Sequence, residues 1–88
     1  MFLNNNIPNN LLGVYYFLNQ QDDIIYIGKS IDVKKRISQH LAKGRKRLIK
    51  TFNKLKIKKL HSELESLLFE SQEIKKHQPI FNRRLRRT

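Results

Sequence analysis

Residues 13–29 read GVYYFLNQQDDIIYIGK, and this stretch decides the fold. Two apolar and aromatic runs, residues 11–18 and 24–27, flank the polar segment 19–23. Because strands favour aromatic and β-branched residues and polar residues favour turns, the pattern predicts a β-hairpin. The turn carries no Asn-Gly or Asp-Gly pair, so the sequence leaves open whether Tyr15 and Tyr26 lie opposite one another.

The charge of the chain indicates the class of partner. Nineteen Lys and Arg against seven Asp and Glu give a net charge of +12 on 88 residues, enough chain for one modest core. Such an excess favours polyanions, because neutralising phosphates releases counterions. Small ribosomal proteins, repressors and nucleases share this profile, and a membrane surface attracts the same charge.

The sequence favours a cytoplasmic, nucleoid-associated protein without a membrane role. No apolar run approaches the roughly 18 residues that a membrane span needs, and the first residues lack the features of a secretory signal. The absence of cysteine excludes disulfides and thiolate metal sites. Residues 1–10 hold five Asn and one Pro, a composition that predicts a flexible leader before a single domain at 11–88.

Two helices and a third strand are expected after the hairpin. Val33, Ile37 and Leu41 recur at four-residue steps, which predicts a helix of about three turns that begins at Ser30 or Asp32. Gly44 ends it. The basic segment that follows is ambiguous: residues 56–61 fit a short strand, and residues 47–55 fit a helix.

The last helix, residues 62–77, is the clearest. Ser62 and Glu65 have the spacing of a capping box. Its apolar stripe consists of Leu64, Leu67, Leu68 and Ile74, which we expect to face the core. In that arrangement Glu70 lies at the edge of the stripe, whereas Glu73 and Lys76 lie on the outer face. Pro79 ends the helix.

Three polar side chains border these predicted core stripes. Arg36 and His40 lie one turn apart beside Val33 and Ile37, so both could reach a site on the sheet, although each alone fits an ordinary helix residue. Glu70 fits either an ion pair or a metal ligand. A lone carboxylate among the candidates suits one Mg²⁺ or Mn²⁺ ion that keeps most of its waters.

The tyrosine-containing triplets resemble the GIY-YIG nuclease family. GVY at 13–15 and YIG at 26–28 are separated as in that family, with Val14 replacing the usual isoleucine. The resemblance continues through five single residues: Lys29, Arg36, His40, Glu70 and Asn82. It covers roughly residues 11–87 and is greatest to the N-terminal endonuclease domain of the nucleotide-excision-repair nuclease, its shorter homologues and related exonuclease-fused domains.

The resemblance implies an α+β fold, a small antiparallel sheet of about three strands flanked by helices, in a single domain over residues 11–88. It implies a divalent-metal-dependent DNA endonuclease of DNA repair with little sequence specificity, working with DNA and with a repair-complex or exonuclease partner. The implied site residues are the motif glycines Gly13 and Gly28, the metal ligand Glu70 for Mg²⁺ or Mn²⁺, and the catalytic residues Tyr15, Tyr26, Lys29, Arg36, His40 and Asn82.

Individual roles follow from that resemblance together with charge. Tyr15 would take the proton from water and Tyr26 would orient water or phosphate, although the sequence does not rank the two and either can act through His40. Lys29 and Arg36 would lower a tyrosine pKa, and Arg36 would also neutralise phosphate charge. Asn82 would hold the site or the phosphate.

The remaining cations predict a track for the DNA backbone that does not read sequence. The track residues are Lys34, Lys35, Arg45, Lys46, Arg47, Arg83, Arg84, Arg86 and Arg87. Two other interpretations stay open: a catalytically silent DNA-binding or docking module of the same fold, and an RNA-binding protein of ribosomal type. Metal-dependent DNA nicking that is lost in Glu70→Ala would support the nuclease over the silent module, and tight RNA binding without cleavage would indicate the RNA-binding protein.

Overall fold

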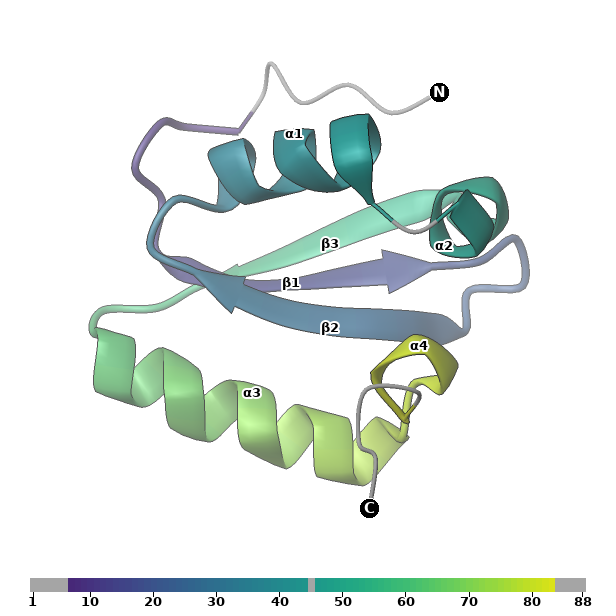
Figure 1. Ribbon diagram of the computed structural model, residues 1–88. Helices are drawn as coiled ribbons and strands as arrows, with labels where there is room; N and C mark the ends of the chain where they lie inside the picture. Colours follow the sequence, from purple (N-terminus) through teal and green to yellow (C-terminus); the bar gives the residue numbers. More distant parts are fainter. Residues whose placement is uncertain (1–6, 45, 84–88) are drawn as a thin grey trace.

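A three-stranded antiparallel sheet with helices on both faces forms the molecule (Figure 1). The computed structural model describes residues 7–44 and 46–83, with the side chain of Arg83 outside the description. The elements in chain order are β1 (Gly13–Leu18), β2 (Ile24–Ser30), α1 (Val33–Lys43), α2 (Lys46–Thr51), β3 (Lys54–Lys59), α3 (Glu63–His77) and α4 (Ile80–Arg83). The predicted fold class is confirmed. The basic segment after α1, whose structure the sequence left ambiguous, contains both a helix, α2, and a strand, β3.

The hairpin forms as the sequence predicts, and its register answers the question that the turn left open. The strand order is β2-β1-β3, so β1 is central and β2 and β3 are the edges. Tyr15 pairs with Gly28, and Tyr26 pairs with Phe17, so the two tyrosines are not opposite one another. The register shifts next to Phe17, where Ile25 is the extra residue, and both Ile25 and Tyr26 contribute to the same core cluster.

Helix α1 covers one face of the sheet, together with α2 (Figure 1). The Asp32 carboxylate accepts from the Lys35 N–H at its start and Gly44 follows its end, as predicted. The core on this face is built from Ile7, Tyr15, Phe17, Ile25, Tyr26, Val33, Ile37, Leu48 and Phe81. Two details differ from expectation: Leu41 is 37% exposed, and Ile7, within the predicted leader, is buried. Residues 1–6 lie outside the described part of the chain.

Helix α3 packs on the opposite face, along β2 and β1, and its orientation contradicts the sequence-based expectation. The Ser62–Glu65 capping box forms, and Gln78 and Pro79 follow the helix end. However, Leu64, Leu67 and Leu68 are 67%, 50% and 56% exposed, so the predicted core stripe faces outward and only its last member, Ile74, is partly buried.

The side of α3 that meets the sheet carries polar residues. Ser66 is buried, and Glu73, which we predicted on the outer face, accepts a hydrogen bond from the Tyr16 hydroxyl at 3.0 Å. The prediction for Glu73 was therefore wrong, because a contact with a residue 57 positions away outweighs the pattern of the helix itself. Within the described residues, no helix combines the length and apolar character needed to cross a bilayer.

Candidate active site

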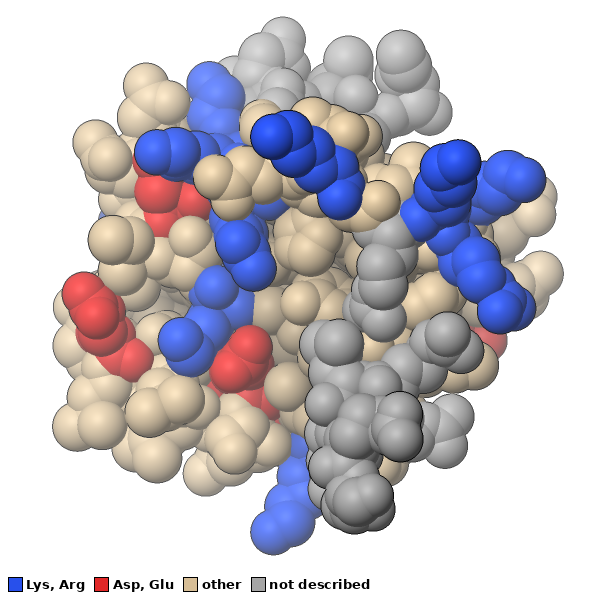
Figure 2. Space-filling view, in the orientation of Figure 1, with Lys and Arg blue, Asp and Glu red and all other residues tan. Residues whose placement is uncertain are grey.

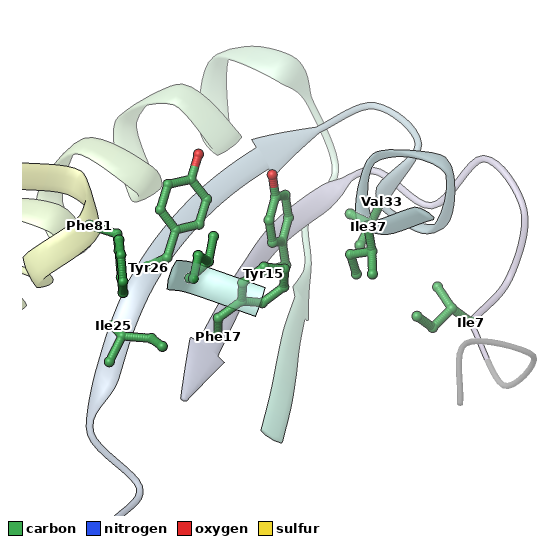
Figure 3. Close-up of a cluster of buried hydrophobic side chains, with 9 residues drawn as sticks. Ile7, Tyr15, Phe17, Ile25, Tyr26, Val33, Ile37 and Phe81 are labelled. Carbon is green, nitrogen blue, oxygen red and sulfur yellow. The ribbon is translucent and has the colours of Figure 1, made fainter. Parts of the chain in front are cut away.

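Tyr15 lies at the centre of the candidate site. It projects from the central strand and is 1% exposed, and Figure 3 shows its hydroxyl directed the same way as that of Tyr26. The ring centroids of the two tyrosines are 6.3 Å apart. A Cβ on Gly28, directly across the hairpin from Tyr15, would collide with the Tyr15 hydroxyl and ring, so only glycine leaves room for this tyrosine.

The other motif glycine serves the sheet. Gly13 begins β1 and pairs with Ser30 on one side and Lys59 on the other. A Cβ there would overlap the backbone carbonyl of Lys58, so Gly13 allows β3 to approach closely. The two glycines thus have different physical roles, one toward a backbone and one toward the tyrosine.

His40 from α1 meets Tyr15 directly. The His40 Nε2 atom lies 2.9 Å from the Tyr15 hydroxyl oxygen. The imidazole ring stands edge-on to three aromatic rings, with centroid distances of 5.7 Å to Tyr15, 5.4 Å to Phe17 and 5.3 Å to Tyr26. These rings fix the imidazole plane, because T-shaped aromatic contacts have a preferred geometry. Phe17 was not predicted to take part, although strand alternation places it on the same face as Tyr15.

The electrostatics around Tyr15 differ from what the sequence suggested. Burial raises the pKa of Tyr15 well above its usual value of 10, and the neighbouring Tyr26 raises it further. The Arg36 side chain lowers this pKa, as we predicted for a cation in the site, but it does not outweigh burial. Tyr15 is therefore a neutral hydroxyl at neutral pH and can donate its proton to His40 Nε2 in the tautomer that leaves this nitrogen unprotonated.

Arg36 and His40 line a hollow beside the tyrosines. This hollow has a volume of about 640 Å³, is bordered by α1 and Tyr26, and also includes Lys35 and Lys43. A second hollow of about 340 Å³ shares Lys35 and Arg36 and extends toward Ser30. Arg36 is exposed between the two, and its guanidinium donates to Gln39 Oε1 at 3.3 Å. A cation in this position can meet a phosphate that lies along α1.

Glu70 reaches the same region from α3. Burial raises the pKa of its carboxyl group, whereas Lys29 on β2 opposes this and favours the ionised form. The Glu70 carboxylate also raises the pKa of Tyr15. Glu70 therefore acts electrostatically on the Tyr15 hydroxyl, just as Lys29 acts on Glu70. Lys29 itself is exposed.

The donor set fits a hard, largely hydrated cation. Across residues 7–44 and 46–83, no three His, Asp or Glu side chains gather into a possible metal cluster, so the protein would supply few ligands at Glu70. Mg²⁺ prefers oxygen ligands and retains several waters, so one half-buried carboxylate suits this ion better than zinc.

Asn82 holds the edge of the sheet. It lies in α4 and is 7% exposed, and its amide oxygen accepts from the Ile27 N–H at 2.7 Å while its amide nitrogen donates to the Ile27 carbonyl at 2.9 Å. The side chain therefore pairs with β2 as a neighbouring strand would. Because Ile27 follows Tyr26, Asn82 fixes the backbone next to that tyrosine, which fits the holding role more than direct contact with phosphate.

Part of the predicted DNA track can be located. Figure 2 shows Lys and Arg side chains gathered over α1 and α2, the elements that carry Lys34, Lys35, Lys46 and Arg47. All of these are exposed except Lys34, which is half-buried. Lys43, which we did not single out, also faces the larger hollow. Arg45, Arg84, Arg86 and Arg87 and the side chain of Arg83 lie outside the described residues.

Comparisons with known proteins agree with this arrangement. The model of the UvrC-like GIY-YIG domain matches residues 11–83. The UvrABC system protein C of Mycoplasma capricolum is 40% identical over 74 residues, which cover 80% of this chain. That of Methylobacillus flagellatus is 40% identical over 82 residues and 88% of this chain. The chain spans only 13% and 14% of the length of these two curated relatives.

A solved structure has the same fold. The GIY-YIG N-terminal endonuclease domain of UvrC from Thermotoga maritima, bound to its catalytic divalent cation, magnesium, superimposes with a TM-score of 0.77 at 27% identity. The superposition covers 85% of this chain and 86% of that one. The match therefore extends over the sheet and the helices that carry the candidate residues. This chain belongs to the family of UvrC-like GIY-YIG domains.

Proposed function

We propose that the protein is a divalent-metal-dependent DNA endonuclease that hydrolyses phosphodiester bonds with little sequence preference. The observation that carries the proposal is the convergence of three side chains from α1 and α3 on the Tyr15 hydroxyl: His40 lies at hydrogen-bond distance, and Arg36 and Glu70 both act on its pKa. Membership of the family and the similarity to an endonuclease domain bound to magnesium support the same activity.

The Tyr15–His40 pair is suited to activating water. The buried hydroxyl is a weak acid, so it cannot act as a preformed phenolate. Instead, the Tyr15 oxygen accepts a proton from water while the Tyr15 proton passes to His40 Nε2, 2.9 Å away. The water oxygen attacks phosphorus, and the bond to the leaving oxygen breaks. Tyr26, beside both groups, orients the water or the phosphate.

Charge on the phosphate is balanced by groups on opposite sides of Tyr15. The exposed Arg36 guanidinium donates to the non-bridging oxygens as negative charge develops. Lys29 favours the ionised form of Glu70 and so opposes the effect of burial on its pKa. Glu70 would hold one Mg²⁺ or Mn²⁺ ion, which supplies Lewis-acid stabilisation of the phosphoryl and leaving oxygens. A single ion fits because the described part of the chain contains no cluster of three or more His, Asp or Glu side chains such as a two-metal site would use.

The partner molecules follow from charge and from the relatives. The cations on α1 and α2 bind the DNA backbone, so binding by this chain is weak and falls as salt rises. Because the curated relatives are components named for a UvrABC system, we infer a role in DNA repair, in the cytoplasm and on nucleoid DNA. A repair complex or an attached exonuclease would then select the target.

Nicking of supercoiled and branched DNA, with Mg²⁺, Mn²⁺ or chelator, tests the proposal. The parent should nick in a metal-dependent way, and Glu70→Gln, which keeps the shape but removes the charge, should lose at least about 100-fold. Glu63→Gln, on an exposed side of the same helix, is the matched control and should retain activity. A parent that binds DNA in a salt-sensitive way but never nicks it would instead indicate a silent docking module.

A further inference from the structure

Helix α3 turns its stripe of three leucines away from the sheet. Leu64, Leu67 and Leu68 are at least half exposed, whereas the side toward the sheet carries Ser66 and Glu73 together with Phe69 and Ile74, which are partly buried against the core. An apolar stripe on a helix usually packs against the core, because burial removes its surface from water. A rotation of α3 about its own axis would bury leucine but would expose Phe69, serine and glutamate, so apolar burial alone does not fix the orientation and a further interaction can decide it.

A hydrogen bond between the central strand and α3 supplies that interaction. The Tyr16 hydroxyl donates to Glu73 Oε1 at 3.0 Å, and Tyr16 itself is only 9% exposed. His77 Nε2 lies 3.5 Å from the same carboxylate oxygen. Burial and the Glu73 carboxylate raise the pKa of Tyr16, so its hydroxyl keeps the proton that it donates. Because Tyr16 belongs to the middle strand of the sheet, the anchor for α3 is rigid.

The orientation of α3 decides where Glu70 points. Glu70 and Glu73 are three residues apart, so they lie on the same side of the helix and turn together. We propose that Tyr16 is a positioning residue: its hydrogen bond to Glu73 holds α3 with the leucines outward and thereby directs the Glu70 carboxylate toward Lys29 and Tyr15. The catalytic consequence rests on the proposed function, whereas the orientation of α3 does not.

Thiol labelling of metal-free protein tests the orientation directly. The chain has no cysteine, so a single substitution gives an unambiguous probe. Ser66→Cys and Ser71→Cys are matched probes on one helix, the first at a buried position that is 3% exposed and the second at an exposed one. With Tyr16 intact, the thiol at position 66 should react slowly and the thiol at position 71 quickly.

Tyr16→Phe removes the hydroxyl and keeps the ring. Without the hydrogen bond, labelling at position 66 should rise about fivefold and labelling at position 71 should fall, as expected for loss of one net hydrogen bond. Reciprocal changes identify a rotation. If both positions become more reactive, α3 opens by local unfolding; if neither changes, Tyr16 does not hold the helix. Either result overturns the proposal.

The leucines provide a suppressor test. Replacing Leu64 and Leu68 with Gln in the Tyr16→Phe protein removes the apolar stripe that favours rotation, so protection at position 66 should return. Leu41→Gln, a partly exposed leucine on α1, is the control and should restore nothing. If the Gln substitutions at Leu64 and Leu68 do not restore protection at position 66, the leucine stripe does not compete with the Tyr16–Glu73 hydrogen bond for the orientation of α3.

Nicking assays then connect orientation with catalysis. Tyr16→Phe should raise the Mg²⁺ concentration for half-maximal nicking in inverse proportion to the fraction of molecules that keep Glu70 toward the sheet, and the two Gln substitutions should reverse this. An unchanged Mg²⁺ dependence despite a rotated helix would remove the link to Glu70. If the parent shows no nicking at all, the proposed function fails while the labelling result still decides whether Tyr16 orients α3.

Discussion

Asn82→Ala should strongly destabilise the fold, and its effect can be worked out from two contacts. The Asn82 amide makes hydrogen bonds of 2.7 and 2.9 Å to the N–H and carbonyl of Ile27, at a position that is 7% exposed. Each bond contributes about 0.5–1.5 kcal/mol net, and buried groups left unpaired add to the loss. The expected decrease in the free energy of unfolding is about 2–3 kcal/mol, a large fraction of the stability of a small domain.

Denaturant unfolding of parent and variant at 25 °C measures this change, and a thermal melt should show a fall in Tm of about 8–24 °C. Asn82→Asp is the informative companion, because its carboxylate still accepts from the Ile27 N–H but cannot donate to the Ile27 carbonyl. Protonation of the Asp carboxyl group restores that donor. The loss of unfolding free energy in the Asp variant should therefore shrink as pH falls, whereas the loss in the Ala variant should not.

The two variants together can refute the reasoning. A loss below about 1 kcal/mol for Asn82→Ala would mean that water or backbone movement satisfies Ile27 in place of the amide. An Asp variant whose deficit is independent of pH would mean that the donated bond to the Ile27 carbonyl contributes nothing. In either case, Asn82 would not be the residue that fixes β2 beside Tyr26.

Three further outcomes follow from the site. Gly28→Ala should lower both stability and nicking, because its methyl group would meet the Tyr15 hydroxyl, and melting curves with nicking rates measure this. Tyr15→Phe should keep the melting temperature within a few degrees but lower nicking about 10²–10⁴-fold, since only the hydroxyl next to His40 is lost. Burial raises the pKa of Glu70, so metal-dependent nicking should fall with decreasing pH at a higher pH than for an exposed glutamate; Lys29→Gln should shift this acid limb to still higher pH.

Local patterns account for what the sequence could predict. The hairpin follows from two apolar runs around a polar turn, and α1 follows from Val33 and Ile37 with an Asp32 cap, all within short windows. Among the candidate residues, Arg36 and His40 could be chosen because they lie one turn apart on the helix face that borders the core. In each case the information lies within one or two elements, where periodicity and capping act.

The features that escaped prediction depend on contacts between distant parts of the chain. The pairing of Tyr15 with Gly28 depends on the bulge at Ile25, and no dipeptide in the turn predicts that bulge. The pKa of Tyr15 depends on how deeply the ring is buried, a property of the whole core, so the cations near it could not be weighed from sequence. The predicted orientation of α3 was wrong. The leucine stripe looks like a core face in the sequence, whereas in the structure the side bearing Glu73, which accepts a hydrogen bond from Tyr16, meets the sheet.

These exceptions concern residues that prepare the site for chemistry. Tyr15 occupies the space left by Gly28, and α3 gives up apolar contact so that the side bearing Glu70 and Glu73 meets the sheet. A fold selected for burial alone would have turned the leucines inward and placed the carboxylates in water. The outward leucines of α3 accompany a carboxylate held near a buried tyrosine, the arrangement that the proposed function requires if a hydrated cation and a proton acceptor are to act on the same phosphate.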